Sequence, residues 1–127
     1  MAELEVLFPR KSHVELRQAA PGRLRPDEVR GPTVCSLVSP GTELAWLDAG
    51  RFPVRPGYAA VFRADELGSR VSGIEPGSLV FCMGPHRSYQ QVDARYTIVV
   101  PKGMAPETAV LARLVGVSMT TLMTTVA

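Results

Sequence analysis

Proline and glycine set the strongest limit on what this chain can fold into. There are 11 of each in 127 residues, and nearly all of them lie before residue 107. Both residues interrupt helices and favour turns. The first hundred residues are therefore predicted to form short strands joined by turns. The length fits one domain, which can bury about two-thirds of its unfolded surface.

Charge and cysteine content exclude several classes of protein. The 14 basic residues are scattered and the net charge is only +2, so no nucleic-acid partner is expected. The two cysteines, Cys35 and Cys82, form no CxxC motif, and no apolar segment follows Met1 that could act as a signal. A cytoplasmic location is the expectation.

Alternating apolar residues predict the strands. Leu4, Val6 and Phe8 would share one face of an N-terminal strand, and residues 13–17 repeat the pattern after a short turn, so the two are predicted to pair. Further strands are predicted at residues 58–65, 79–82, 88–92 and 97–100.

The apolar, β-branched segment 29–38 is predicted to be a bent or edge strand. It contains Gly31-Pro32, which an interior strand accommodates only at a bulge.

Two helices are predicted. Residues 43–49 can form a short one, with Thr42 as N-cap and Gly50 as the stop. A C-terminal helix is predicted from about residue 106, because Pro106 suits a first helical position. Its apolar residues recur at helical spacing: Leu111, Leu114, Val115, Ser118, Leu122 and Val126. Charged residues and five threonines are expected to make it too polar to span a bilayer.

The order of four motifs resembles a known family. SPGTEL, PGYAAV, GSRVSGIEPGSLVF and VVPKGMAPETAVLARL together resemble the N-terminal substrate domain of medium-chain dehydrogenase/reductases, the zinc-type alcohol dehydrogenase superfamily. VSPGTEL is most similar to a subgroup that includes bacteriochlorophyllide-type dehydrogenases. The resemblance implies a mainly β fold over residues 1–127, a GroES-like, partly open β-barrel with short helices and a C-terminal helix.

In that family a Rossmann domain follows and binds NAD(H) or NADP(H). No GxGxxG motif occurs here, so the nucleotide-binding domain is expected to be absent from this chain.

The resemblance also implies where a catalytic zinc would be bound. The matching positions are Pro40, Tyr58 with Ala59, and Gly116, and none of these side chains is a normal zinc ligand. The four-cysteine lobe of zinc-type relatives is missing as well. We therefore expect no metal, as in the zinc-independent reductase branch.

Three residues are candidate catalytic groups. Thr42 matches the hydroxyl that relays a proton in zinc-type relatives, although it could simply cap the helix. Tyr58 stands where the family has histidine and could hydrogen-bond a carbonyl oxygen, or it could be a buried tyrosine with a satisfied hydroxyl. His86 lies on a loop and could act as a general acid, or it could be an ordinary surface histidine.

Three further residues are candidate binding groups. Ser39 could donate to a substrate or only fix the turn. Glu43 could face the cleft as a carboxylate or only stabilise the helix dipole. Thr120 lies where family members place a threonine near the nicotinamide ring.

The predicted function is that of the substrate domain of a zinc-independent, NAD(P)H-dependent reductase acting on a carbonyl or enone, truncated or split from its cofactor domain. Alone, the chain is expected to be inactive. The alternative is a non-catalytic GroES-like binding module; a third possibility is a stable product without activity. The apolar stripe on the last helix predicts either a homo-oligomer or a separate nucleotide-binding chain.

Overall fold

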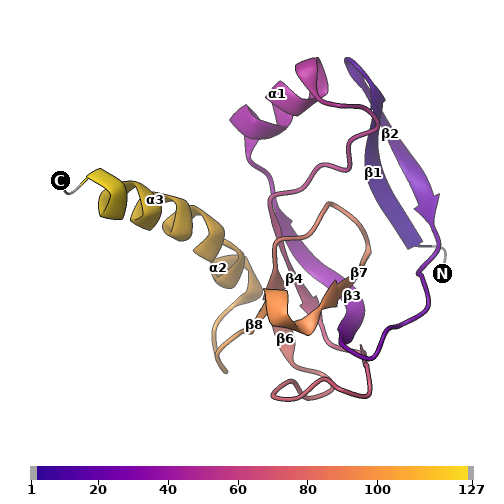
Figure 1. The fold of residues 1–127 in the computed structure, drawn as a ribbon, viewed down its shortest axis with the longest axis vertical. Helices are drawn as coiled ribbons and strands as arrows, with labels where there is room; N and C mark the ends of the chain where they lie inside the picture. The colour runs from indigo at the N-terminus through magenta and orange to yellow at the C-terminus, as the bar shows by residue number, and fades with distance from the viewer. Residues whose placement is uncertain (1–2, 126–127) are drawn as a thin grey trace.

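The computed structural model describes residues 3–125 (Figure 1). In chain order the elements are β1 (Glu3–Arg10), β2 (His13–Ala19), β3 (Glu28–Leu37), α1 (Pro40–Ala49), β4 (Ala59–Arg63), β5 (Glu66–Leu67), β6 (Leu79–Cys82), β7 (Tyr89–Asp93), the 3-10 turn η1 (Ala94–Tyr96), β8 (Thr97–Val99), α2 (Pro106–Val110) and α3 (Ala112–Thr125).

The strands form a curled half-barrel beside a two-stranded hairpin. The larger sheet runs β5-β3-β4-β6-β8, and β7 also pairs with β3; all of these pairings are antiparallel. β1 and β2 pair only with each other, and single bridges from Glu5 to Arg87 and from Phe8 to Val54 attach them to the rest. The mainly β, GroES-like, partly open barrel predicted from the motifs is confirmed.

β3 is an interior strand, so the edge-strand alternative is wrong while the bend is confirmed. Its N-terminal half pairs with both β5 and β7, and its C-terminal half pairs with β4. The register shifts between Thr33 and Cys35, and this bulge lets the strand carry Gly31-Pro32. A Cβ at Gly31 would collide with the backbone of Arg63, so glycine is needed there.

The N-terminal hairpin forms as predicted, but burial in β1 does not follow the alternation of apolar residues. Glu5, Leu7 and Phe8 are buried, whereas Leu4 and Val6 are only half-buried. Glu5 is buried because its carboxylate accepts a hydrogen bond from Arg55 at 3.1 Å. A register shift after Leu7 brings Phe8 inward as well.

β4 is the centre of the core. Ala60 and Phe62 pack with β3 and β6 residues on one face, and Ala59 and Val61 pack with α2 on the other. All four are 0% exposed. A strand buried on both faces is apolar throughout rather than alternating, which explains the sequence AAVF.

α1 begins three residues earlier than predicted. Pro40 occupies the first turn and Ser39 is the N-cap residue, so Thr42 lies inside the helix and is not its cap. Proline is favourable at a first helical position because its missing N–H would have no partner there. Gly50 ends the helix as predicted.

The C-terminal helix is broken at Leu111 into α2 and α3. Ala109 and Val110 of α2 are buried, but α3 has no buried residue. The predicted stripe is exposed where the structure describes it; Val126 lies outside the described residues. The α3 hydroxyls all donate to carbonyls three or four residues earlier: Ser118, Thr120, Thr121, Thr124 and Thr125.

By length and composition, residues Pro106–Thr125 are apolar enough to cross a membrane. The expectation that polar residues dilute the segment below that limit is therefore wrong, because leucine, valine and methionine outweigh them. One such helix is weak evidence for a membrane, since soluble proteins contain helices that pass the same test.

Candidate functional site

A chain of hydrogen bonds links three elements around His86. The His86 Nε2 atom lies 2.9 Å from Glu43 Oε2, and its Nδ1 atom lies 2.8 Å from Ser36 Oγ. Glu43 comes from α1, Ser36 from the end of β3, and His86 from the β6–β7 loop. Glu43 is buried and His86 half-buried, while Ser36 is exposed. The network therefore runs from a buried carboxylate to a solvent-exposed hydroxyl.

Backbone contacts hold His86 in place. Its N–H donates to Pro56 O at 2.8 Å, and its carbonyl accepts from the N–H of Val6 at 2.9 Å. Gly57 makes this packing possible, because it has a φ of +139° and lies directly against Pro85 and His86. A side chain at residue 57 would be strained and would collide with the loop.

Glu43 is fixed from the other side by its own helix. Its Oε1 atom accepts the backbone N–H of Ser39 at 2.9 Å, which satisfies one of the free donors at the start of α1. Each carboxylate oxygen therefore has a partner. Glu43 thus joins the start of α1 to His86, and its predicted contact with a substrate stays a prediction.

The partners define how the imidazole can carry a proton. An ionised Glu43 accepts a hydrogen bond, which places a proton on Nε2 and leaves Nδ1 to accept from the Ser36 hydroxyl. A proton on Nδ1 would reverse the direction of the Ser36 hydrogen bond, with Nδ1–H donating to Ser36 Oγ. This arrangement can store a proton and exchange it through Ser36.

The two predicted hydroxyl groups make no direct hydrogen bond to Glu43, His86 or Ser36 within residues 3–125, although Thr42 is linked to Glu43 through Ser39. Thr42 Oγ1 accepts from Ser39 Oγ at 3.2 Å. Tyr58 is half-buried directly before β4, and its N–H donates to Leu37 O at 3.3 Å. Its hydroxyl makes no hydrogen bond within residues 3–125, so the satisfied buried tyrosine considered as an alternative is not observed.

An arginine covers the Tyr58 ring. The Arg113 Cζ atom lies 4.7 Å from the ring centroid, within the range of a cation–π contact. Sequence reasoning missed Arg113, which resembles an ordinary helix-surface charge, and it missed Ser36. β3 also carries Glu28, Arg30 and Thr33, so no local signal distinguished Ser36.

Thr120 is exposed on α3, and its hydroxyl donates to Gly116 O at 2.9 Å. The structure therefore joins Ser39, Thr42, Glu43 and His86 but leaves Thr120 apart.

The residues at the expected zinc positions do not fit a zinc ion. Pro40 is in the first turn of α1, Ala59 is buried in the core, and Gly116 has no side chain. No group of three His, Cys, Asp or Glu side chains suited to a metal occurs within residues 3–125. Burial raises the pKa of the Cys82 thiol to about 12, so it is not a ready thiolate ligand.

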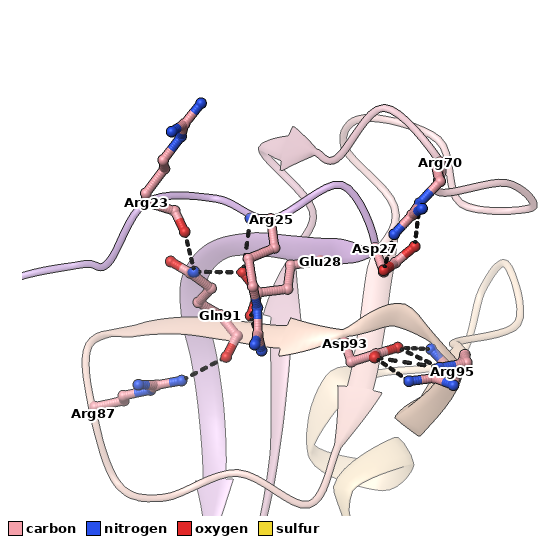
Figure 2. A network of polar contacts seen from close by, with 9 residues as sticks. All are labelled: Arg23, Arg25, Asp27, Glu28, Arg70, Arg87, Gln91, Asp93 and Arg95. Carbon is pink, nitrogen blue, oxygen red and sulfur yellow. Dashed lines mark hydrogen bonds and ion pairs between the residues drawn. The ribbon is translucent and has the colours of Figure 1, made fainter.

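A second polar cluster lies at the other end of β3 (Figure 2). Arg70 pairs with Asp27 and Arg95 with Asp93, while the buried Glu28 accepts from Arg25 and Gln91. Burial opposes ionisation of Glu28, but the hydrogen bonds from Arg25 and Gln91 outweigh it and lower its pKa.

In the same cluster, hydrogen bonds from the Arg95 side chain and backbone lower the pKa of Asp93 to about 2. The contacts of the whole cluster connect the 23–28 loop, the 70–71 turn and the end of β7, which indicates a structural role.

Comparison with known proteins supports the fold. No protein-family model and no curated protein sequence matches the chain. Solved structures do match. Galactitol-1-phosphate dehydrogenase from Escherichia coli has a TM-score of 0.74 and 20% identity, and the match covers 85% of this chain and 41% of that one. For 2R,3R-butanediol dehydrogenase from Bacillus subtilis the TM-score is 0.77 and the identity 14%, and the match covers 87% of this chain and 44% of that one.

A third match is a dehydrogenase from Sinorhizobium meliloti bound to NADP, with TM-score 0.70, 16% identity, and coverage of 84% of this chain and 40% of that one. The chain thus spans about two-fifths of the length of the structures it matches. The fold is the one predicted from the motifs, that of the GroES-like domain of medium-chain dehydrogenase/reductases.

Proposed function

We propose that this chain is the substrate domain of a zinc-independent, NAD(P)H-dependent reductase that acts on a carbonyl compound or an enone. The observation that carries the proposal is the Glu43–His86–Ser36 network. Reduction of a carbonyl group by hydride requires one proton at the substrate oxygen, and this network holds a titratable imidazole between a buried carboxylate and a solvent-exposed hydroxyl.

Each residue has a role in the proposal. The Ser36 hydroxyl would give its proton to the substrate oxygen and take one from His86 Nδ1–H. Glu43 positions the imidazole, which regains its proton from water. Tyr58 and Thr42 bind the substrate oxygen with their hydroxyl groups, and Ser39 orients Thr42 through the 3.2 Å contact. An aligned hydroxyl donor stabilises the charge that develops on that oxygen.

The cofactor would be held mainly by a nucleotide-binding domain. NAD(P)H, when bound, supplies the hydride. Thr120 would contribute from this chain by facing the nicotinamide, for which its hydroxyl must exchange its bond to Gly116 O for one to the cofactor.

The same residues support zinc independence as part of this proposal. At the Tyr58 position, where a zinc-type relative would place a ligand, the structure has a phenol ring covered by the Arg113 guanidinium. A fixed cation next to this position disfavours a second, divalent cation.

A partner surface is part of the proposal. β8, α2 and α3 enclose an apolar groove of about 530 Å³, lined among others by Phe81, Ile98, Val100, Met104 and Val115. The exposed face of α3 continues it. A nucleotide-binding domain would cover this surface, and association of two copies of the chain is the alternative.

The test is oxidation of NADPH or NADH with a panel of aldehydes, ketones, quinones and enones. The chain would be assayed alone and together with a nucleotide-binding polypeptide, taken from an adjacent reading frame if one encodes it. We expect turnover only in the second arrangement, unaffected by 1,10-phenanthroline. His86→Gln should lower kcat by about 100-fold or more, the usual contribution of a general acid, whereas His13→Gln, the matched control, should not.

Absence of turnover in both arrangements would overturn the enzymatic function, and inhibition by the chelator would overturn zinc independence. A specific observation favours the alternative, a non-catalytic GroES-like binding module: both nitrogens of His86 are already bonded within the protein. In that case His86→Gln would lower stability without any activity to lose.

A further inference from the structure

Arg113 differs from five other arginines in how its charge is satisfied, and its Nε atom is buried without a hydrogen-bond partner within residues 3–125. Arg25, Arg30, Arg55, Arg70 and Arg95 each form an ion pair with a carboxylate, three of which appear in Figure 2. Arg113 has no ion pair and no hydrogen bond within that part of the chain. Its only specific contact is with the Tyr58 ring, 4.7 Å away.

A half-buried guanidinium without an acceptor is energetically unfavourable. A buried donor that lacks a partner loses its hydration without compensation, and such groups in folded proteins usually have a functional reason. The stacking on Tyr58 offsets part of this cost but satisfies no N–H group. The missing partner must be a hydrogen-bond acceptor, and a guanidinium prefers an anionic one with two oxygens.

The surroundings restrict where that partner would bind. The Tyr58 hydroxyl, which makes no hydrogen bond within residues 3–125, is on the same ring that Arg113 covers. Gly57, the preceding residue, packs against His86. The unsatisfied cation is therefore attached to the segment that also positions His86.

We propose that Arg113 binds an anionic group of the substrate, a carboxylate or a phosphate, with Tyr58 as the platform that orients its guanidinium. This rests on the proposed function in that the anion belongs to the molecule being reduced. It defines the substrate class as a carbonyl compound or enone that carries a negative charge near the reacting carbon.

The experiment observes Arg113 directly, by NMR of its side-chain Nε–H group in the 15N-labelled chain. Pyruvate and inorganic phosphate would be titrated in turn, with butanone as the neutral control for pyruvate. The signal would be assigned by its disappearance in Arg113→Gln. We expect a saturable shift of this signal with pyruvate, phosphate or both, and no shift with butanone.

Matched variants separate charge from shape. Arg113→Gln should weaken anion binding by about 10- to 100-fold, the loss expected for one charged hydrogen bond, as followed through the backbone amides of Gly57 and Tyr58. Arg113→Lys should retain part of the affinity, because it keeps the charge but not the planar fork. Arg51→Gln, which removes an exposed arginine, should have no effect. The wild-type titration remains decisive even if a variant fails to fold.

Three results would overturn the proposal. The first is that the Nε–H signal of Arg113 does not shift, and the second is that the signals of exposed arginines shift equally. The third is a shift of the Arg113 signal with NADP⁺ but with neither small anion, which would assign Arg113 to the cofactor. Since no hydride transfer is measured, failure of the reductase assay would leave this titration unchanged.

Discussion

The strand β4 and the helix α3 are both rich in apolar residues, yet they bury them to opposite extents. The first four residues of β4 are 0% exposed, whereas Leu122 and Met123 of α3 are 63% and 75% exposed. β4 is enclosed because β3, β6 and α2 cover its two faces. The comparison shows that apolar composition alone does not determine burial here; the number of neighbouring elements does.

The largest test of this contrast is a pair of truncations. Phe62→Ala should lower the free energy of unfolding by about 3–5 kcal/mol, because it removes a fully enclosed ring and leaves a cavity. Leu122→Ala should change it by less than about 0.5 kcal/mol. Urea denaturation of both variants measures the difference. Equal losses would mean that α3 is covered in solution.

A smaller effect is expected where α1 is attached to the barrel. Glu43→Gln should cost about 1–3 kcal/mol, because it weakens a charged hydrogen bond to His86 in a buried position. Asp48→Asn on the same helix is the control, since its pair with Lys11 is exposed on both sides, and it should cost less than about 0.5 kcal/mol. If the two variants unfold at the same urea concentration, the His86 pair does not anchor α1.

The loss of stability at low pH should depend on Asp93 in the second polar cluster (Figure 2). The pKa of Asp93 is lowered from 3.8 to about 2, so the folded state binds fewer protons than the unfolded state in that interval. Its stabilising effect is complete above the unfolded pKa and is lost as pH falls from 3.8 to about 2. Asp93→Asn should flatten this part of the profile, measured as the urea midpoint against pH.

Arg95→Gln is the partner variant and should flatten the same interval, because it removes the group that lowers the pKa of Asp93. Low-pH profiles identical to that of the wild type in both variants would contradict the assignment.

Substitutions on α3 are expected to have the smallest effect on the free energy of unfolding and the largest effect on association. Leu114→Ser with Val115→Ser should leave the free energy of unfolding within about 0.5 kcal/mol but lower the mass observed by light scattering at high protein concentration. Val14→Ser with Leu16→Ser is the control, since both residues are exposed on β2, and it should leave the mass unchanged. A monomeric wild-type chain would show that no second copy covers α3.

Most helices and strands could be predicted from the sequence, but the elements that lie beside them in the fold could not. The strand Leu79–Cys82 was predicted with its correct ends because turns flank it on both sides. β3 was assigned an edge position as one alternative because Gly31-Pro32 argues against an interior strand, and the bulge after Thr33 that accommodates it depends on β4. The α1 start was missed because Thr42 is as good a cap as Ser39 in local terms.

The candidate site was predicted as separate residues. Glu43 and His86 were each identified, but their contact joins residues 43 positions apart, and neither local pattern encodes it. Ser36 and Arg113 were missed for the same reason, since their importance depends on which side chain lies opposite. The predicted roles of all six site residues stay predictions: Ser39, Thr42, Glu43, Tyr58, His86 and Thr120.

The hydroxyl groups of α3 have a consequence for whatever covers that helix. Because Thr120, Thr121 and Thr124 donate to carbonyls of their own helix, they need no water molecule and no partner atom. Removing α3 from water would therefore strand no hydroxyl donor. To an approaching surface these threonines present mainly methyl groups, so the helix can be transferred into a dry interface almost as if they were valines.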